Sequence, residues 1–187
     1  MTPLEGQVAL AALRPTVDER RDLARARGKE AQSLLPSLFP GTEAGPAVFV
    51  GSGGHAKDIK LLTTLGITCV INLAPNVIKS PARSYAKAGI NHLALEARDD
   101  NDFNILASCL PLVQSFLDEH PPTGKVLIHC MAGVNRSATV AVAYLMLRDR
   151  RNLLELFAEC SATRPSILQN ANFQLQLCAL AASENLL

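Results

Sequence analysis

The chain has 187 residues, a length typical of one domain and short for two. Hydrophobic residues make up 48% of it and charged residues 19%, a balance that excludes a disordered or fibrous protein. A net charge of +1 excludes the broad basic surface that nucleic acids require, so any anion site must be local.

Residues 1–46 differ from the rest because charge is dense in them and Pro and Gly residues punctuate their end. Thr16, followed three residues later by Glu19, has the pattern of a capping box, and the run up to Leu35 is rich in helix-forming residues. We therefore predict an amino-terminal extension, residues 1–46, with one helix from Thr16 to Leu35, weakened at Gly28, and a linker.

From residue 47 onward, short β-branched runs alternate with helical stretches. The runs typical of strands are Val48–Val50, Ile67–Leu73, Ile90–Leu95 and Val126–His129. The helical stretches include Ala56–Leu65, Phe103–Leu117, Ser137–Leu147 and Asn172–Ser183. Pro111 falls inside the second of these, so that helix either begins late, with Pro111 in its first turn, or is kinked. The alternation predicts an α/β fold in which a central, mostly parallel sheet is flanked by helices on both faces.

The most informative segment runs from the strand that ends at His129, through a loop that contains Gly133, into the helix that begins near Ser137. A loop that bends back over a helix amino terminus points its backbone N–H groups into one concavity, and the helix dipole adds positive charge there. Such a cradle fits a tetrahedral oxyanion.

Cys130 lies at the mouth of this predicted cradle, where backbone N–H groups and the cation of Arg136 stabilise a thiolate. We therefore expect a sulfur that is ionised and nucleophilic at neutral pH. Arg136 can present a planar fork to two phosphate oxygens and bind the transition state more strongly than the substrate. We expect His129 to fix the loop by hydrogen bonding, and the Ser137 hydroxyl to hydrogen-bond the sulfur when it becomes a leaving group.

Taken singly, a cysteine, histidine or arginine is more often a core or surface residue than a catalytic one. Together, His129-Cys130, a five-residue interval centred on Gly133, and Arg136-Ser137 form a specific combination. It matches the His-Cys-x5-Arg-Ser/Thr signature of the protein tyrosine phosphatase superfamily, and its surroundings resemble the dual-specificity phosphatase branch.

The resemblance covers about residues 47–180 and implies that residues 47–187 form a catalytic domain with a fold like that of protein tyrosine phosphatases. It implies a phosphate-binding loop that also includes Met131, Ala132, Gly133, Val134 and Asn135. In the family, an Asn in the second strand, here Asn72, braces this loop. Arg164-Pro165, Asn170, Phe173 and Leu177 resemble the start of the last helix, although Gln169 stands where the family has Pro.

Cleavage of a phosphate monoester is faster when a carboxylic acid protonates the leaving oxygen. The segment that follows the strand ending near Leu95 offers Asp99, Asp100 and Asp102. The resemblance puts Asp99 in register with the family's general acid, and Asp100 is the alternative. Asp102 or Asn104 is expected to cap the following helix.

The odd number and wide spacing of the cysteines indicate free thiols: Cys69, Cys109, Cys130, Cys160 and Cys178. No cofactor or metal is expected, because the four histidines are scattered without carboxylates at ligand spacing. The chain lacks a secretory signal and an apolar run long enough to cross a bilayer, so we expect an intracellular protein of the cytoplasm or nucleus with no membrane or nucleic-acid partner. Its oligomeric state is open.

The resemblance implies a dual-specificity protein phosphatase of signalling, which hydrolyses phosphotyrosine and phosphoserine or phosphothreonine through a phospho-cysteine intermediate. Phosphate or vanadate should bind in its active site. A lipid or RNA phosphate stays open as the substrate, although the uncharged variable loop positions argue against inositol lipids. Two other classes also stay open: a pseudophosphatase-like module that binds phosphate without turnover, and a sulfur-transfer or arsenate-reducing enzyme on a similar loop.

Overall fold

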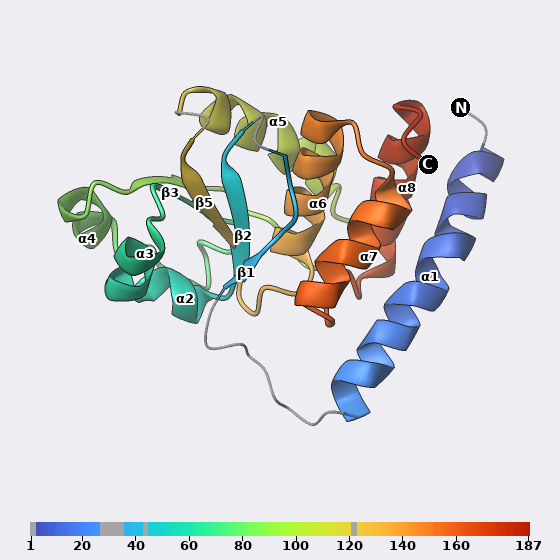
Figure 1. The fold of residues 1–187 in the computed structure, drawn as a ribbon, viewed down its shortest axis with the longest axis horizontal. Coiled ribbons are helices and arrows are strands. Elements are labelled where there is room, and N and C mark those ends of the chain that lie inside the picture. Colours follow the sequence, from blue (N-terminus) through green and yellow to red (C-terminus); the bar gives the residue numbers. More distant parts are fainter. Residues whose placement is uncertain (1–2, 27–35, 43–44, 121–122) are drawn as a thin grey trace.

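The computed structural model describes residues 3–26, 36–42, 45–120 and 123–187. Its elements in chain order are α1 (Pro3–Ala26), β1 (Ser37–Leu38), β2 (Ala47–Gly51), α2 (Gly53–Lys57), α3 (Ile59–Leu65), β3 (Cys69–Asn72), α4 (Ala82–Lys87), β4 (Asn91–Ala94), α5 (Ile105–Asp118), β5 (Lys125–His129), α6 (Arg136–Asp149), α7 (Leu153–Thr163) and α8 (Ala171–Ser183), as labelled in Figure 1. In the described part of the chain, no helix is long and apolar enough to span a bilayer.

The strands form one sheet in the order β1-β2-β5-β3-β4. β1 is antiparallel to β2, and every other neighbouring pair is parallel. The register pairs His129 with both Gly51 and Asn72, so the last residues of the three inner strands lie side by side. The prediction of a mostly parallel sheet is confirmed.

Successive side chains of a strand point to opposite faces of the sheet. Because apolar side chains point to both faces here, helices cover both. In β5, Val126 and Ile128 pack into the larger core, which α5 to α8 cover, whereas Leu127 packs into a smaller core. That second core lies under α2, α3 and α4, with Tyr85 of α4 fully buried in it (Figure 1). The predicted fold class is therefore confirmed.

Helix α1 lies along α7 and α8, on their side away from the sheet (Figure 1). Its inward stripe of Ala9, Leu10, Leu13 and Val17 is buried in the larger core. The predicted start at Thr16 is wrong, because the helix begins at Pro3 and three residues of this stripe lie before Thr16. Packing of the apolar stripe outweighs the local capping pattern at Thr16, which lies inside the helix. The predicted continuation to Leu35 falls outside the described residues.

Two further predictions about elements are corrected by the structure. Part of the predicted linker is strand β1, which pairs with β2 and is followed by the buried side chain of Phe39. The stretch Ala56–Leu65 is interrupted at Asp58, whose carboxylate caps α3 by accepting a hydrogen bond from the Leu61 N–H, 2.9 Å away. Helix α5 begins at Ile105 with Pro111 in its interior, so the alternative of a late start is excluded.

Candidate active site

The loop of residues 130–135 joins β5 to α6 at the edge of the sheet where β2, β3 and β4 also end. Gly133 gives this loop its turn, because its φ of 73° lies in the left-handed region that favours glycine. A Cβ there would lie 2.6 Å from the Gly51 carbonyl oxygen and 2.7 Å from Nη2 of Arg164. The loop can pack this closely on β2 only with glycine at that position.

The sulfur of Cys130 is almost completely buried inside this loop, with 2% of the residue exposed. Sγ lies 3.3 Å from the Ser137 hydroxyl and accepts a hydrogen bond from the Gly133 N–H at 3.3 Å. Burial alone would raise the pKa of the thiol. Hydrogen bonds from the side chain and backbone of Ser137, the charge of Arg136 and the Gly133 amide outweigh burial and lower that pKa. The loop therefore stabilises a thiolate.

Arg136, the first residue of α6, points its guanidinium toward the segment that follows β4. Nη1 donates a hydrogen bond of 3.1 Å to the Ala97 carbonyl oxygen. Nε is buried without a hydrogen-bond partner among the described residues and lies 3.8 Å from Oδ2 of Asp99. A buried N–H donor on a cation without a partner is a ready contact for an anion.

The carboxylates of Asp99 and Asp100 face different ways. Both Asp99 oxygens lie 3.2 Å from the side-chain amide of Asn135, and Oδ1 also accepts a hydrogen bond of 3.0 Å from Asn170. Asp100 instead caps its own turn, where its Oδ1 accepts a 2.8 Å hydrogen bond from the Phe103 N–H. The structure thus brings Asp99, and not Asp100, to the loop that holds Cys130.

His129 is fully buried at the end of β5. Its Nδ1 lies 3.2 Å from the Cys130 carbonyl oxygen. Burial lowers the pKa of this histidine to about 4, although the hydrogen bond to Cys130 opposes that change, so the ring is neutral at pH 7. Next to the loop, the N–H of Gly53 donates a hydrogen bond of 3.1 Å to the Met131 carbonyl oxygen.

Asn72 is fully buried but makes its hydrogen bonds elsewhere. Its side-chain amide donates to the Ile78 carbonyl oxygen at 2.7 Å and to the Ser80 hydroxyl at 3.0 Å, and its Oδ1 accepts from the Ala74 N–H at 2.8 Å. The bracing role implied by the resemblance is therefore corrected. These contacts commit the Asn72 side chain to the segment that follows β3, and not to the loop of residues 130–135.

The side chain that does brace the loop is Arg164, which sequence reasoning missed. Its Nε donates 2.7 Å to the Gly133 carbonyl oxygen and its Nη2 donates 2.9 Å to that of Ala132. Arg164 is the C-cap residue of α7, and only 9% of it is exposed. The sequence marked Arg164 only through its resemblance to the start of the last helix. An arginine at the end of a helix is typical of solvent-exposed positions, so its contact with the loop was not predicted.

The predicted loop residues lie together, and the turn before α8 closes over them. Val134 and Asn135 accept hydrogen bonds from the Leu168 N–H at 3.0 Å and the Gln169 N–H at 2.8 Å. Met131, in contrast, is 54% exposed. Among the described residues, no group of three His, Cys, Asp or Glu side chains is placed to hold a metal ion.

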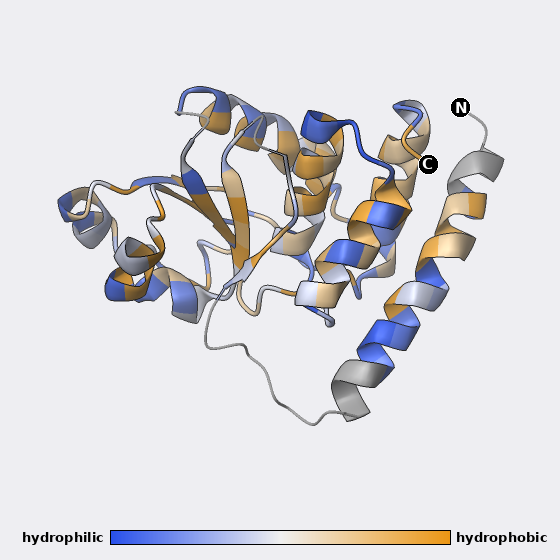
Figure 2. Ribbon diagram, in the orientation of Figure 1, coloured by the Kyte–Doolittle hydropathy of each residue, from blue (hydrophilic) through white to orange (hydrophobic). Residues whose placement is uncertain are grey.

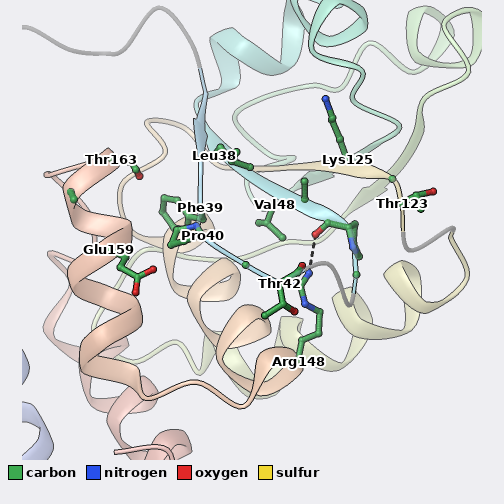
Figure 3. Close-up of a pocket in the computed structure, with 16 residues that line it drawn as sticks. Leu38, Phe39, Pro40, Thr42, Val48, Thr123, Lys125, Arg148, Glu159 and Thr163 are labelled. Atoms are coloured by element: carbon green, nitrogen blue, oxygen red, sulfur yellow. Dashed lines mark hydrogen bonds between the residues drawn. The ribbon is translucent and has the colours of Figure 1, made fainter.

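A cavity of about 840 Å³ lies apart from these residues, between the segment after β1 and helix α7. Figure 3 shows Leu38, Val48 and Thr163 among the side chains around it. Arg148 borders the cavity and donates a hydrogen bond of 2.8 Å to the Pro46 carbonyl oxygen. None of the predicted site residues lines it.

Comparisons with known proteins show the family to which this chain belongs. The family described as "Dual specificity phosphatase, catalytic domain" matches residues 48–183. Mouse dual specificity protein phosphatase 26 is 34% identical over 141 residues, which are 74% of this chain and 65% of that protein. Human dual specificity protein phosphatase 13B is 33% identical over 141 residues, or 74% of this chain and 71% of that protein. The chain thus spans just under two thirds of the length of the first of these relatives.

Solved structures have the same fold. The crystal structure of human DUSP28 superposes with a TM-score of 0.65 at 25% identity, over 80% of this chain and 96% of that one. That of the human tyrosine phosphatase-like serine/threonine/tyrosine-interacting protein gives 0.63 at 31% identity, over 73% and 91%. The fold is that of the protein tyrosine phosphatase superfamily. Within that superfamily, the chain belongs to the dual specificity phosphatase family.

Proposed function

We propose that this protein is a phosphatase that hydrolyses phosphotyrosine and phosphoserine or phosphothreonine esters in proteins through a phospho-cysteine intermediate. Membership of the dual specificity phosphatase family supports the reaction and the substrate class. The observation that carries the mechanism is the buried Cys130 sulfur with a lowered pKa, held in a glycine-containing loop at the amino terminus of α6.

In the first step, the Cys130 thiolate attacks phosphorus and forms an S–P bond while the P–O bond to the substrate oxygen breaks. Backbone N–H groups of residues 131–136 and the guanidinium of Arg136 bind the phosphate oxygens and the transition state. The unpartnered Nε of Arg136 supports this role. Protonated Asp99 gives its proton to the departing oxygen, which leaves as an alcohol or phenol.

In the second step, Asp99 is a carboxylate and takes a proton from water as the water oxygen attacks phosphorus. The S–P bond breaks, and inorganic phosphate and the Cys130 thiolate are released. The Ser137 hydroxyl, 3.3 Å from the sulfur, stabilises the thiolate as it leaves. His129 holds the Cys130 carbonyl group and thereby the backbone that carries the nucleophile.

We also propose that residues 47–187 form the catalytic domain and that residues 1–46 extend it. The family match begins at residue 48, which supports this division. The buried stripe of α1 on α7 and α8 supports an extension that is part of the folded unit and not a free tail.

The function is tested by phosphate release from 4-nitrophenyl phosphate and from phosphotyrosine and phosphothreonine peptides. We expect release that vanadate inhibits, that chelators leave unchanged and that Cys130→Ser abolishes. Asp99→Ala should lower kcat by about 10²-fold or more, the usual contribution of a general acid. Acid quenching during turnover should trap phosphate on Cys130, detected by mass spectrometry.

The outcomes separate this function from its alternatives. Tight phosphopeptide binding without phosphate release in the unmodified protein would indicate a binding module. Release from lipid or RNA phosphates but not from phosphopeptides would overturn the substrate class while keeping the mechanism. Turnover that survives Cys130→Ser would contradict the covalent intermediate.

A further inference from the structure

A ring of hydrogen bonds joins three segments that are far apart in the sequence: the phosphate loop, the segment after β4 and the turn before α8. Asn135, the last residue of the loop, contributes to it through both ends of its side-chain amide. Oδ1 accepts hydrogen bonds from the backbone N–H groups of Gln169 at 2.8 Å and Asn170 at 3.2 Å. Nδ2 lies 3.2 Å from both oxygens of Asp99.

The orientation of the Asn135 amide is fixed by its partners. Two backbone N–H groups can meet only an acceptor, so Oδ1 must face Gln169 and Asn170. Nδ2 is then the end that faces Asp99, where a carboxylate is an acceptor for both oxygens. The backbone N–H groups of Gln169 and Asn170 and the carboxylate of Asp99 therefore all require the same orientation of this amide.

Asn170 secures the same carboxylate from the other side. Its Oδ1 caps α8 by accepting hydrogen bonds from the N–H groups of Asn172 at 3.0 Å and Phe173 at 3.3 Å. Its Nδ2 is thereby free to donate to Oδ1 of Asp99 at 3.0 Å and to the Asp100 carbonyl oxygen at 3.2 Å. The acid segment is thus tied to the amino terminus of α8.

These contacts make the two oxygens of Asp99 unequal. Oδ1 accepts from both asparagines, whereas Oδ2 accepts from Asn135 and lies 3.8 Å from Nε of Arg136. Since Nε is the unpartnered donor of Arg136, a phosphate bound to that guanidinium would lie on the side of Oδ2.

We propose that Asn135 and Asn170 are positioning residues, which hold Asp99 in place before substrate binds and direct its Oδ2 toward the leaving oxygen. This inference rests on the proposed function and adds to it the atom that carries the proton. Oδ1 is the anchor, and Oδ2–H gives its proton to the leaving oxygen as the S–P bond forms. The acid segment is accordingly set for catalysis without a closing movement.

A misplaced acid costs most when the leaving group needs a proton, and displacement by about 1 Å can cost on the order of 10²-fold in rate. The test therefore compares kcat/KM for phenyl phosphate, whose leaving group needs protonation, with that for 4-nitrophenyl phosphate, whose leaving group needs little. Asn135→Ala should lower the phenyl to 4-nitrophenyl ratio of kcat/KM by about tenfold or more. Asn170→Ser, which keeps a capping oxygen for α8 but lacks the amide donor, should lower it in the same direction.

Two controls separate positioning from a structural role. Asn172→Ala changes the same end of α8 without touching Asp99, since its side chain donates to the Phe103 carbonyl oxygen at 2.9 Å, and should leave the ratio unchanged. In an Asp99→Ala background, Asn135→Ala should no longer alter the ratio. An equal loss on both substrates, or a ratio that still falls in the Asp99→Ala background, would overturn the inference while phosphatase activity stands. A wild-type protein inactive on both substrates would overturn the proposed function and this inference with it.

Discussion

All five cysteines are buried, but the pKa values of their thiols differ in direction. Burial raises the pKa of Cys109 and Cys178 to about 11 and that of Cys160 to about 12. Cys130 is also buried, with 2% of the residue exposed, yet its pKa is lowered, because hydrogen bonds from Ser137 and Gly133 and the charge of Arg136 stabilise its thiolate. The directed N–H and O–H groups of the loop, and not exposure to water, account for the difference.

His129 makes the stability of the protein depend on pH. Its pKa is lowered by burial to about 4 from an ordinary value of 6.5, so between these pH values only the unfolded chain takes up the proton. The free energy of unfolding should therefore fall as pH falls through this window, by about 3 kcal/mol in all at pH 4. Urea unfolding of wild type and His129→Asn across this range measures the effect.

The variant His129→Asn should lack that part of the pH dependence, whereas His92→Asn, at an exposed position, should keep it. An identical slope in wild type and His129→Asn would show that the buried ring is not the source.

At the scale of elements, the β-branched runs located β2, β3, β4 and β5 to within two residues, and the fold class followed from their alternation with helical stretches. Element boundaries that depend on packing were harder to predict from the sequence. The start of α1 is set by docking of Leu13 and its neighbours, and β1 forms only because β2 is there to pair with it. Local sequence carries no record of either partner.

The same limit applied to the site. Cys130, Arg136 and Ser137 are adjacent in the sequence to the turn that organises them, so a local motif sufficed to select them. Asn170 and Arg164 reach the site from a distant turn and from the end of α7. Contacts across such separations depend on tertiary packing and have no periodic or local signature.

The end of α7 should control the phosphate loop through Arg164. Arg164→Lys keeps the charge but cannot donate to the carbonyl groups of Gly133 and Ala132 in the geometry of a guanidinium. Leaving a buried carbonyl group unsatisfied should lower the free energy of unfolding by about 1–3 kcal/mol and reduce kcat. Denaturant unfolding and phosphate release measure the two effects.

Arg150→Lys is the matched control, since Arg150 also ends a helix but makes an exposed ion pair with Glu184. We expect it to change the free energy of unfolding by no more than about 0.5 kcal/mol. Equal effects of the two variants would contradict the bracing role of Arg164.

At the scale of the molecule, the amino-terminal helix is part of the same folded unit as the site. Figure 2 shows that α1 carries both apolar and polar residues, and its buried residues belong to the core that α5 to α8 share. The site lies where the parallel strands end. Helix α1 packs on α7 and α8, whose ends hold Arg164 and Asn170. Stability of the extension and of the site should therefore be coupled.

Leu13→Ala tests this coupling. Leu13 is fully buried, so its truncation should lower the free energy of unfolding by about 2–5 kcal/mol. Val8, on the same helix, is 65% exposed, and Val8→Ala should change it by no more than about 0.5 kcal/mol. Thermal or urea unfolding of both variants measures these changes. Similar losses of unfolding free energy in the two variants would mean that α1 does not dock on the domain.

The central claim is that the folded loop holds Cys130 as a thiolate, and the most direct measurement is the pH dependence of its alkylation by iodoacetamide. Mass spectrometry of each cysteine-containing peptide follows Cys130 and Cys109 in the same sample. We predict a half-maximal alkylation rate for Cys130 at a pH below that of a free thiol, slowed by vanadate, while Cys109 reacts only when the protein unfolds. A Cys130 that becomes reactive only at or above the pH of a free thiol would contradict the account.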